Sequence, residues 1–523
     1  MKITTAAEMR DIDRVTTEEH GVPSLTLMEN AGTAVVRFVM AMFKRARRVT
    51  ILCGKGNNGG DGFVAARKFG DEGIRTTVIL LAEPSELKGD AAAMFARMGE
   101  TPIVVKSAEE LKSEALAEAM KADVIVDAIL GTGFHPPASG LYADAIALIN
   151  RSRKPVVAVD IPSGADADAA EPSSVVRAKA DYVVTFTAPR PAHIFGALTK
   201  GDTMVAPIGS PEAAIQSELN AHMITPRDFA TFLADRDPEA HKGTYGHALI
   251  IGGSVGKSGA VAMAGLAALR SGAGLSTVAT PRSVLPVVAG YTPEIMTEPL
   301  AETEVGSISP LAYGYGRIEA ILEGKRVVAL GPGIGRNPQT VEFIHTFMLD
   351  CKAPLVIDAD GLNAFEGAAR KLLGKNRPLV LTPHPGEMAR ILDVHTSEIQ
   401  KDRIQIAKEF ATRQQCYLVL KGHRTIVALP DGAVWVNVTG NPGMASGGSG
   451  DVLTGMIAGL MAQTEDVATA VLAAVYLHGL AGDIAREKVG EASLIAGDIL
   501  ANIPEAFKRA KMSLAQKGFT FHA

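Results

Sequence analysis

The sequence predicts two α/β domains, each with helices on both faces of a mostly parallel sheet. Short apolar, β-branched runs alternate with alanine-rich helical stretches along most of the 523 residues. Such runs between helices are typical of parallel sheets that are covered on both faces. At about 150 residues a domain, the chain is too long for a single hydrophobic core. A net charge of −5 with 47% hydrophobic residues indicates a folded protein without a basic nucleic-acid-binding surface.

The first half reads as two helices followed by alternating strands and helices. We expect helices at 23–44, 62–69, 89–98 and 142–150, and strands at 49–52, 77–81, 124–128, 156–159 and 182–186. This order predicts a Rossmann-like three-layer αβα domain over residues 1–215.

A change of composition over 209–240 predicts a linker, after which the alternation resumes. We expect strands at 248–251, 275–279, 326–330, 355–357, 379–381 and 417–420, a hairpin arm at 433–438, and helices at 259–271 and 451–461. This order predicts a second αβα domain over residues 225–510.

Three features of the whole chain predict its compartment and partners. Three cysteines without a CxxC pair exclude a disulfide framework and a cysteine-type zinc site, and they favour a reducing compartment. The first residues have no apolar signal core, and no uncharged stretch is long enough to span a membrane. We therefore expect a cytoplasmic homo-oligomer that binds small molecules and neither membrane nor nucleic acid.

The first glycine-rich segment lies between an expected strand and an expected helix. Gly54, Gly56 and Gly59 satisfy the GxGxxG pattern of dinucleotide-binding loops, although a tight turn alone would also use them. The same segment carries two amides and a carboxylate, Asn57, Asn58 and Asp61. These groups favour ligand binding because a turn does not require so many donors and acceptors.

Polar residues also follow the next strands of this half. Asp127 ends one strand, and Ser163 lies just after the following one. In an open α/β sheet, ligands bind at the carboxyl ends of the strands, so Asn58 should meet both residues there. Oxygen ligands with one carboxylate suit a monovalent or weakly held cation. Asp127 could instead cap the helix that follows.

The second glycine-rich segment, 441–451, precedes an apolar helix. Backbone N–H groups at a helix start form an anion hole, and Asp451 at its mouth could deprotonate a hydroxyl that faces a phosphate. Asp451 could also be only the helix N-cap. Upstream, 250–258 looks like a P-loop, but Ile251 stands where that pattern needs glycine.

Four stretches, 28–32, 54–62, 127–134 and 157–164, make about the first 210 residues similar to the YjeF N-terminal family, the NAD(P)H-hydrate epimerases. The resemblance implies a potassium ion held by Asn58, Asp127 and Ser163. It also selects Asp160 over Asp61 as the catalytic acid and base. The implied hydrate contacts are Asn57, Asn58, Gly59, Gly60, Asp61, Gly131, Thr132, Gly133, Phe134, His135, Pro136, Pro137 and Asp160.

About 225–505 resembles the YjeF C-terminal family, the ADP- or ATP-dependent NAD(P)H-hydrate dehydratases of the ribokinase-like superfamily. The matching stretches are 252–254, 259–260, 331–335, 358–360, 382–387, 421–425 and 441–451, with Ser449 where the family has threonine. The resemblance implies that Asp451 is catalytic and that Mg²⁺ accompanies the nucleotide, for which ADP is the favoured choice. Implied hydrate contacts are Ala260, Gly333, Gly335, His384 and Asp451; implied nucleotide contacts are Lys421, Gly422, His423, Arg424, Thr425, Gly447, Gly448, Ser449 and Gly450.

Together the two resemblances imply a metabolite-repair enzyme. One half would interconvert the R and S hydrates, NADHX and NADPHX. The other would phosphorylate the ring hydroxyl of the S form and eliminate phosphate, which restores NADH or NADPH. The alternatives are a ribokinase-like small-molecule kinase with an accessory dinucleotide-binding domain, a non-catalytic nucleotide sensor and a dehydrogenase. A base at Asp451 argues against the sensor, because binding alone needs none.

Overall fold

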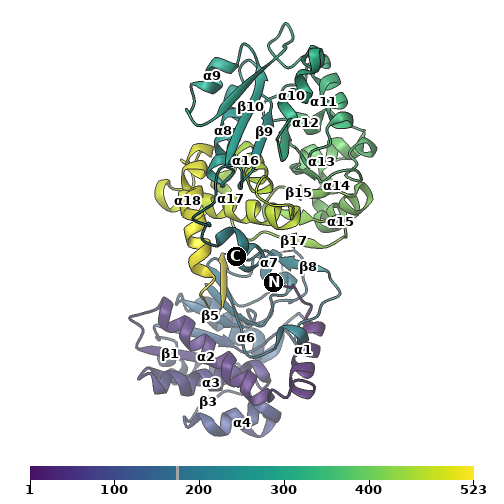
Figure 1. Cartoon of the computed structure of the whole chain (residues 1–523). Helices are drawn as coiled ribbons and strands as arrows, with labels where there is room; N and C mark the ends of the chain where they lie inside the picture. The colour runs from purple at the N-terminus through teal and green to yellow at the C-terminus, as the bar shows by residue number, and fades with distance from the viewer. Residues whose placement is uncertain (172–175, 517, 523) are drawn as a thin grey trace. The chain divides into compact units, whose positions relative to one another are not determined.

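The computed structural model describes residues 1–171, 176–516 and 518–522. The chain divides into two compact units, Met1–Asn220 with Gln516–Ala523, and Ala221–Ala515. Each unit is built around one mostly parallel sheet with helices on both faces (Figure 1), as the sequence predicts.

The sheet of the first unit has the strand order β18-β7-β6-β5-β4-β1-β2-β3 among the described residues. All neighbours are parallel except β18 and β7. The strands are β1 Arg48–Cys53, β2 Arg75–Leu80, β3 Ile103–Val104, β4 Val124–Ala128, β5 Val156–Val159, β6 Tyr182–Phe186, β7 Asp202–Ala206 and β18 Phe519–His522. The helices are α1 Ala6–Glu18, α2 Ser24–Met42, α3 Asn57–Asp71, α4 Gly89–Met98, α5 Glu114–Ala119, α6 Gly140–Arg151 and α7 Pro191–Phe195.

The side chains of successive residues in the central strands point to opposite faces of the sheet and pack in two different hydrophobic cores. Ile51 packs in the core that α2, α3 and α4 cover. Its neighbour Leu52 packs on the opposite face with α5 and α6. Both faces are therefore apolar, which explains why these strands read as continuous hydrophobic runs.

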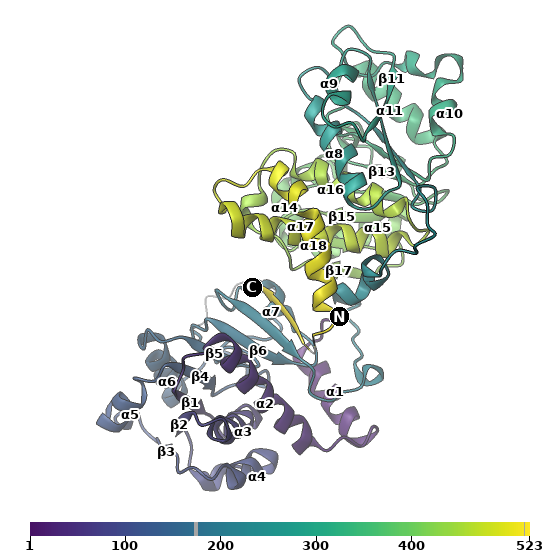
Figure 2. The same cartoon turned by 60° about the vertical axis from the view of Figure 1, so that its left-hand side comes forward.

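The end of the chain returns to the first unit. β18 pairs antiparallel with β7 at the edge of this sheet, and Phe521 is buried there. Figure 2 shows the yellow β18 beside the teal strands. This strand was not predicted from the sequence, because its partner lies about 300 residues earlier and the local pattern is only four residues long.

The second unit has the strand order β11-β10-β9-β12-β13-β14-β15-β16-β17-β8 among the described residues, and only β16 is antiparallel to its neighbours. The strands are β8 Ala221–Met223, β9 His247–Ile251, β10 Leu275–Pro281, β11 Met296–Leu300, β12 Val327–Leu330, β13 Leu355–Ile357, β14 Leu379–Leu381, β15 Tyr417–Leu420, β16 Ile426–Ala428 and β17 Val434–Val436. The edge strand β11 contains Pro299. This strand was not predicted from the sequence, because proline argues against an inner strand.

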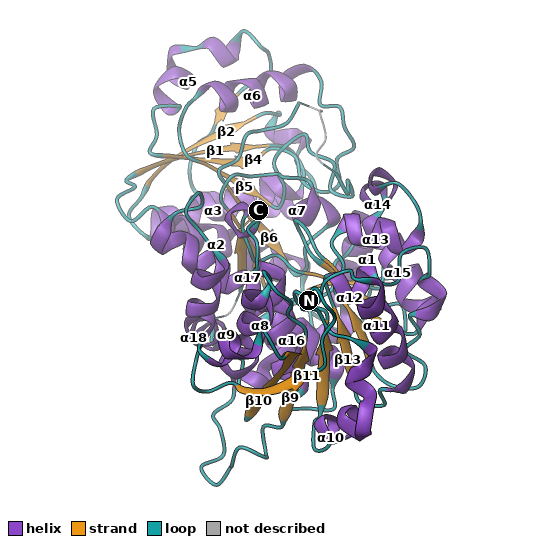
Figure 3. Ribbon diagram, turned by 90° about the horizontal axis from the view of Figure 1, so that it is seen from above, coloured by secondary structure: helices purple, strands orange, loops and turns teal. Residues whose placement is uncertain are grey.

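Helices cover both faces of this sheet (Figure 3). α8 and α16 pack on one face together with α17 and α18. Phe343 of α11, Met388 of α13 and Phe410 of α15 belong to the core on the other face. The helices are α8 Ser258–Arg270, α9 Leu285–Ala289, α10 Arg317–Leu322, α11 Pro338–Asp350, α12 Asp360–Asn363, α13 Pro385–Leu392, α14 Thr396–Lys401, α15 Arg403–Gln414, α16 Ser449–Met461, α17 Val467–Val489 and α18 Ala496–Ser513.

Among the described residues, α17 alone is long and apolar enough to cross a membrane by length and composition. Most of it is buried inside the second unit, where it packs against α16 and α18. A central core helix of an αβα sandwich has the same composition.

Candidate active sites

The first unit holds a cavity of about 780 Å³ at the carboxyl ends of its central strands. Asn57, Asn58 and Asp61 line it from α3, together with Asp160 after β5. The loop after β4 contributes Gly131, Thr132, Gly133 and Phe134. The structure therefore brings together most of the residues expected to contact the hydrate.

Other expected contacts lie outside the residues that line this cavity. Gly59 and Gly60 are among them, as are His135, Pro136 and Pro137. A Cβ on Gly60 would lie 2.6 Å from the sulfur of Met28, so this position faces α2. A Cβ on Gly59 would lie 1.9 Å from the carbonyl oxygen of Gly54, so close backbone packing alone demands glycine there.

Asn57 to Asp61 form the first turns of α3, whereas the sequence analysis placed them in a turn before the helix. The N-cap is Gly56, which has no side chain to satisfy the free N–H groups of the helix start. Backbone donors and the side chains of Asn57, Asn58 and Asp61 therefore face the same cavity.

Asp127 and Ser163 are in direct contact at the expected cation site. The Ser163 hydroxyl donates to Asp127 Oδ1 at 2.5 Å, and the Ser163 N–H donates to Oδ2 at 2.8 Å. Burial raises the pKa of Asp127 to about 6. Asp127 caps no helix, since α6 begins only at Gly140, and that alternative is wrong.

Asn58 is nine-tenths buried, and its Nδ2 has no hydrogen-bond partner among the described residues. Its side chain lies 3.3 Å from the Cβ position of Gly131, in the loop whose Leu130 N–H bonds Ser163 Oγ at 2.9 Å. No group of three or more His, Cys, Asp or Glu side chains among the described residues could hold a metal ion. One carboxylate, one hydroxyl and the amide oxygen of Asn58 would fit a weakly held monovalent cation better than a transition metal.

Asp160 is held by donors on both carboxylate oxygens. Arg190 and Thr185 donate to Oδ1, the latter at 3.0 Å, and the Thr132 N–H donates to Oδ2 at 3.2 Å. Burial raises the pKa of Asp160, but the Arg190 guanidinium, the neighbouring His193 and the hydrogen bonds from Thr185 and Thr132 together outweigh burial, so the pKa lies below its usual value. The residue also adopts a left-handed backbone with φ of 63°, which is uncommon outside glycine.

His193 supports this arrangement as a neutral side chain. The Arg190 N–H donates to its Nδ1 at 2.9 Å, so Nε2 carries the proton and donates to the Asp160 carbonyl oxygen at 2.8 Å. Burial lowers the pKa of His193 to about 4.

Sequence reasoning missed several charged groups of this cavity. Arg190 and Asp13 line it beside Asp61 and Asp160, and Arg190 is only 1% exposed. Burial, with Asp160 and Asp13 nearby, raises the pKa of Asp61 well above its usual range. The only sequence feature that could have indicated a role for Arg190 is its position soon after the end of β6. Asp13 lies in an amphipathic helix, and its sequence context does not distinguish it from other polar residues there.

The second unit holds a cavity of about 530 Å³ at the carboxyl ends of its strands. The expected contacts Ala260, Gly333, Gly447, Gly448 and Asp451 line it. Lys257, Asp360 and Glu387 also line it, and the sequence analysis gave none of them a role.

Asp451 lies in the first turn of α16, where the N-cap is Gly448 with φ of 92°. The reading of Asp451 as a mere N-cap is therefore wrong. Burial raises the pKa of Asp451 to about 7, with the negative charge of Asp358 adding to the rise and Lys421 opposing it. A carboxylate with a pKa near neutrality is matched to general-base work.

His384 does not line this cavity. Its Nδ1 accepts from the N–H groups of Gly386 and Glu387 at 3.0 and 3.3 Å, so the side chain caps α13. Gly335 likewise lies outside the lining residues. Half of the His384 side chain is exposed, and its other ring nitrogen, Nε2, lies 3.6 Å from Glu387 Oε1.

Lys421 to Thr425 form the turn between β15 and β16. Lys421 Nζ donates to Asp358 Oδ1 at 2.8 Å and lies 3.7 Å from Glu387 Oε2. Arg424 is buried and donates to the Val438 carbonyl at 3.1 Å. Within this segment, the Arg424 side chain thus stabilises the fold, and Lys421 points to the start of α16.

The loop that looks like a P-loop packs against the loop after β12. The Gly253 N–H donates to the Pro332 carbonyl at 2.8 Å, and the Ser254 hydroxyl donates to the Gly333 carbonyl at 2.8 Å. These donors face protein and so cannot cradle a phosphate, in agreement with the missing glycine at Ile251.

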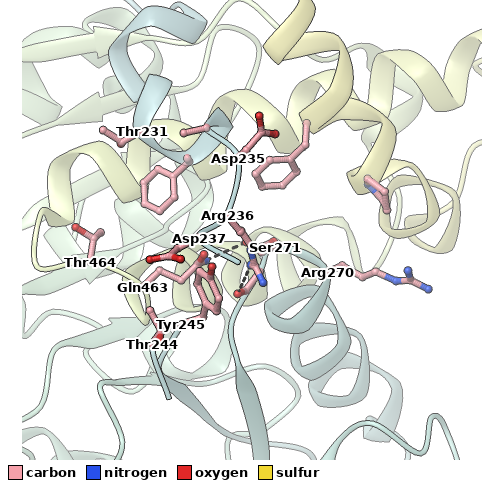
Figure 4. A pocket seen from close by; sticks show the side chains of 15 residues that line it. Thr231, Asp235, Arg236, Asp237, Thr244, Tyr245, Arg270, Ser271, Gln463 and Thr464 are labelled. Atoms are coloured by element: carbon pink, nitrogen blue, oxygen red, sulfur yellow. Dashed lines mark hydrogen bonds between the residues drawn. The ribbon is translucent and has the colours of Figure 1, made fainter. Parts of the chain in front are cut away.

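A further cavity of about 580 Å³ in the second unit lies at the other end of the strands (Figure 4). Tyr245 and Gly272 line it just before β9 and β10 begin. The Arg236 guanidinium stacks 3.7 Å above the Tyr245 ring and donates to the Gly272 carbonyl at 2.7 Å. None of the expected site residues lines this cavity, so the candidate active site stays at the carboxyl ends.

Comparisons with known proteins place each unit in a family. Residues 24–192 match the family model described as YjeF-related protein N-terminus, and residues 248–505 match the one described as NAD(P)H-hydrate dehydratase. A bifunctional NAD(P)H-hydrate repair enzyme from Moorella thermoacetica is 43% identical over 518 residues, which is 96% of each chain. One from Thermofilum pendens is 37% identical, over 97% of this chain and 96% of the relative.

Among solved structures, an ADP/ATP-dependent NAD(P)H-hydrate dehydratase from Bacillus subtilis, co-crystallised with ATP and Mg²⁺, is 36% identical. It covers 56% of this chain and 99% of its own, with a TM-score of 0.47. The αβα architecture predicted for the second unit is confirmed by its mostly parallel sheet, and the same residues match the dehydratase family model. The chain belongs to the family of bifunctional NAD(P)H-hydrate repair enzymes.

Proposed function

We propose that the chain repairs hydrated nicotinamide cofactors in two steps. The first unit epimerises the R and S hydrates of NADH and NADPH, and the second returns the S hydrate to NADH or NADPH at the expense of ADP or ATP. Support comes from the two full-length relatives and from family models that match each unit separately. Joining the activities is useful because a stereospecific dehydratase alone would leave the R hydrate unrepaired.

The observation that carries the dehydratase proposal is Asp451, partly buried in a glycine-lined cavity at the start of α16. Its carboxylate takes the proton of the ring hydroxyl, whose oxygen attacks the terminal phosphorus of the nucleotide. The bond from that phosphorus to the departing nucleotide breaks. Phosphate then leaves the ring carbon far more readily than hydroxide, pushed out by the lone pair of the ring nitrogen. Loss of a proton from the adjacent ring carbon then restores the ring double bond.

The nucleotide would bring Mg²⁺, which neutralises phosphate charge when it is bound. The Bacillus subtilis relative was co-crystallised with both ATP and Mg²⁺, which supports this part of the proposal. Backbone N–H groups at the start of α16 would stabilise the charge that develops on the transferred phosphoryl group.

In the first unit, we assign Asp160 as the acid and base of epimerisation. The substrate carbon bears a hydroxyl beside the ring nitrogen, so inverting it requires one bond to break and reform with proton transfer. Arg190, Thr185 and the Thr132 N–H fix the orientation of the carboxylate. A held carboxylate loses little freedom when the substrate arrives.

Asn58, Asp127 and Ser163 would hold the potassium ion. The ion would supply a fixed positive charge near the substrate, which carries phosphates. A cytoplasmic location, a homo-oligomer and the division of the two activities between the units stay predictions.

The test uses a mixture of R and S NADH hydrates with ADP or ATP, Mg²⁺ and K⁺, and follows the return of reduced-nicotinamide absorbance. We expect full recovery with the wild type, fast recovery of only the S fraction with Asp160→Asn, and none with Asp451→Asn. Absence of recovery with either nucleotide would overturn the repair function. A stable phosphorylated product would instead make the second unit a small-molecule kinase.

A further inference from the structure

A buried ion pair lies directly behind the candidate anion hole of the second unit. Asp358 follows β13 and is 1% exposed. Its Oδ1 accepts from Lys421 Nζ at 2.8 Å, and its Oδ2 accepts from the Thr454 hydroxyl at 2.7 Å. Thr454 is itself fully buried on α16, one turn after Asp451. Both carboxylate oxygens are thus satisfied, and one of the donors belongs to the helix that carries the base.

The ammonium group of Lys421 is thereby placed at the start of α16. Its Nζ lies 3.3 Å from the position that a Cβ on Gly450 would occupy. Only a fifth of the side chain is exposed. A lysine that only attracted a nucleotide would be a mobile surface group. The ammonium of Lys421 is instead held in place by Asp358, with Glu387 nearby, before any ligand binds.

Without the charge of Asp358, the Lys421 ammonium could form an ion pair with another carboxylate. Glu387 Oε2 already lies 3.7 Å away, and Asp451 is close enough to raise the pKa of Lys421 further. An ion pair between Lys421 and Asp451 would occupy the lone pairs that the ring hydroxyl needs and would weaken the carboxylate as a base.

We propose that Asp358 and Thr454 are positioning residues of the dehydratase. They hold the Lys421 ammonium beside Gly450, where it faces the phosphoryl group in transfer, and they keep it from pairing with Asp451. The inference rests on the proposed function. Asp358 neither gains nor loses a proton in the reaction: the hydroxyl proton goes to Asp451, and Lys421 donates a hydrogen bond to a phosphoryl oxygen.

The charged groups that surround Asp451 make this arrangement measurable. They are Asp358 after β13, Asp360 of α12 with its partners Lys257 and Arg336, Glu387 of α13 and Lys421 after β15. Half-exposed His384 lies next to Glu387, with its Nε2 3.6 Å from Glu387 Oε1. His478 of α17 donates behind them to the Ser449 carbonyl at 3.0 Å and stays neutral, because burial lowers its pKa to about 4. Only Asp358 bonds both Lys421 and the helix of Asp451 among these groups.

The test is Asp358→Asn in the full-length protein, assayed on the S hydrate with ADP and Mg²⁺ across pH. In the wild type, kcat/KM should rise with pH as Asp451 loses its proton at about pH 7. In the variant, we expect this acid limb to move down by about 1 pH unit or more. We also expect kcat above the limb to fall about 100-fold with the KM for the hydrate little changed.

Thr454→Val and Thr454→Ser form a matched pair. Valine keeps the shape but removes the donor to Asp358, so it should move the acid limb in the same direction by a smaller amount. Serine keeps the donor and should behave as the wild type. These variants also keep the test decisive if Asp358→Asn does not fold, which the fluorescence of Trp435 in β17 would reveal.

Several outcomes would overturn the proposal. One is a folded Asp358→Asn enzyme with a wild-type acid limb, whether or not its kcat falls. Another is an effect confined to the KM for ADP, which would make Lys421 a ground-state nucleotide contact. If the wild-type enzyme restores no NADH, the proposed repair function itself is wrong. That result is distinguishable from a failure of the positioning role of Asp358, which would show only in the variants.

Discussion

The close packing of α16 against α8 provides a sharp test of how the second active site is held. A Cβ on Gly455 would lie 2.1 Å from the Ala264 carbonyl oxygen of α8. Gly455→Ala therefore has to push the two helices apart by about 1 Å, since ordinary contacts of this kind start near 3.4 Å. Overpacking of this size costs about 1–3 kcal/mol, and the better helix propensity of alanine offsets up to about 1 kcal/mol of it.

The same displacement would reach the active site, because α16 begins at Ser449 and carries Asp451 in its first turn. Misplacing a catalytic group by about 1 Å costs about 100-fold in rate. We expect Gly455→Ala to lower the free energy of unfolding of the second unit by about 1–2 kcal/mol and dehydratase kcat by about 100-fold. Epimerisation should be unchanged, since its cavity belongs to the other unit.

Urea unfolding followed by Trp435 fluorescence measures this effect on the right unit. Trp435 is the only tryptophan of the chain and lies in β17. Gly497→Ala is the control, because a Cβ there would meet only Ile495 Cδ1 at 3.9 Å. That variant should stay within about 0.5 kcal/mol of the wild type. If Gly455→Ala also unfolds like the wild type and keeps full dehydratase activity, the packing argument is refuted.

Three more predictions follow from the two sites. Dehydratase kcat/KM should rise about tenfold between about pH 6 and pH 8, because Asp451 has a pKa of about 7 and must be ionised to act as a base; a flat profile would remove it from that role. Arg190→Met should raise the pKa of Asp160, since the guanidinium that lowers it is gone, and slow epimerisation about 100-fold, as measured from the rate at which pure S hydrate yields R hydrate. Asp127→Asn should abolish the dependence of that rate on K⁺, measured against a tetramethylammonium control; retained K⁺ activation would exclude the assigned site.

The sequence by itself determined the order of the elements and where ligands should be sought. Strands such as β4, β5 and β13 were predicted at their observed bounds, because a short apolar run between helical stretches is a purely local signal. The two glycine-rich segments likewise start α3 and α16, since close approach and positive φ leave little choice of residue there. Asp160 over Asp61, and the potassium site, came from family resemblance and not from spacing.

Only the tertiary structure decided which distant groups meet and how they are charged. Asp13 and Arg190 join Asp160, and Asp358 joins Lys421 and Thr454, across separations of 63 to 96 residues in the second case. No periodicity encodes such meetings, because they depend on how whole elements pack. The raised pKa of Asp451 and the return of β18 to the first unit have the same origin: burial and strand pairing are properties of the folded chain, whereas propensity and turn chemistry are properties of a few neighbouring residues.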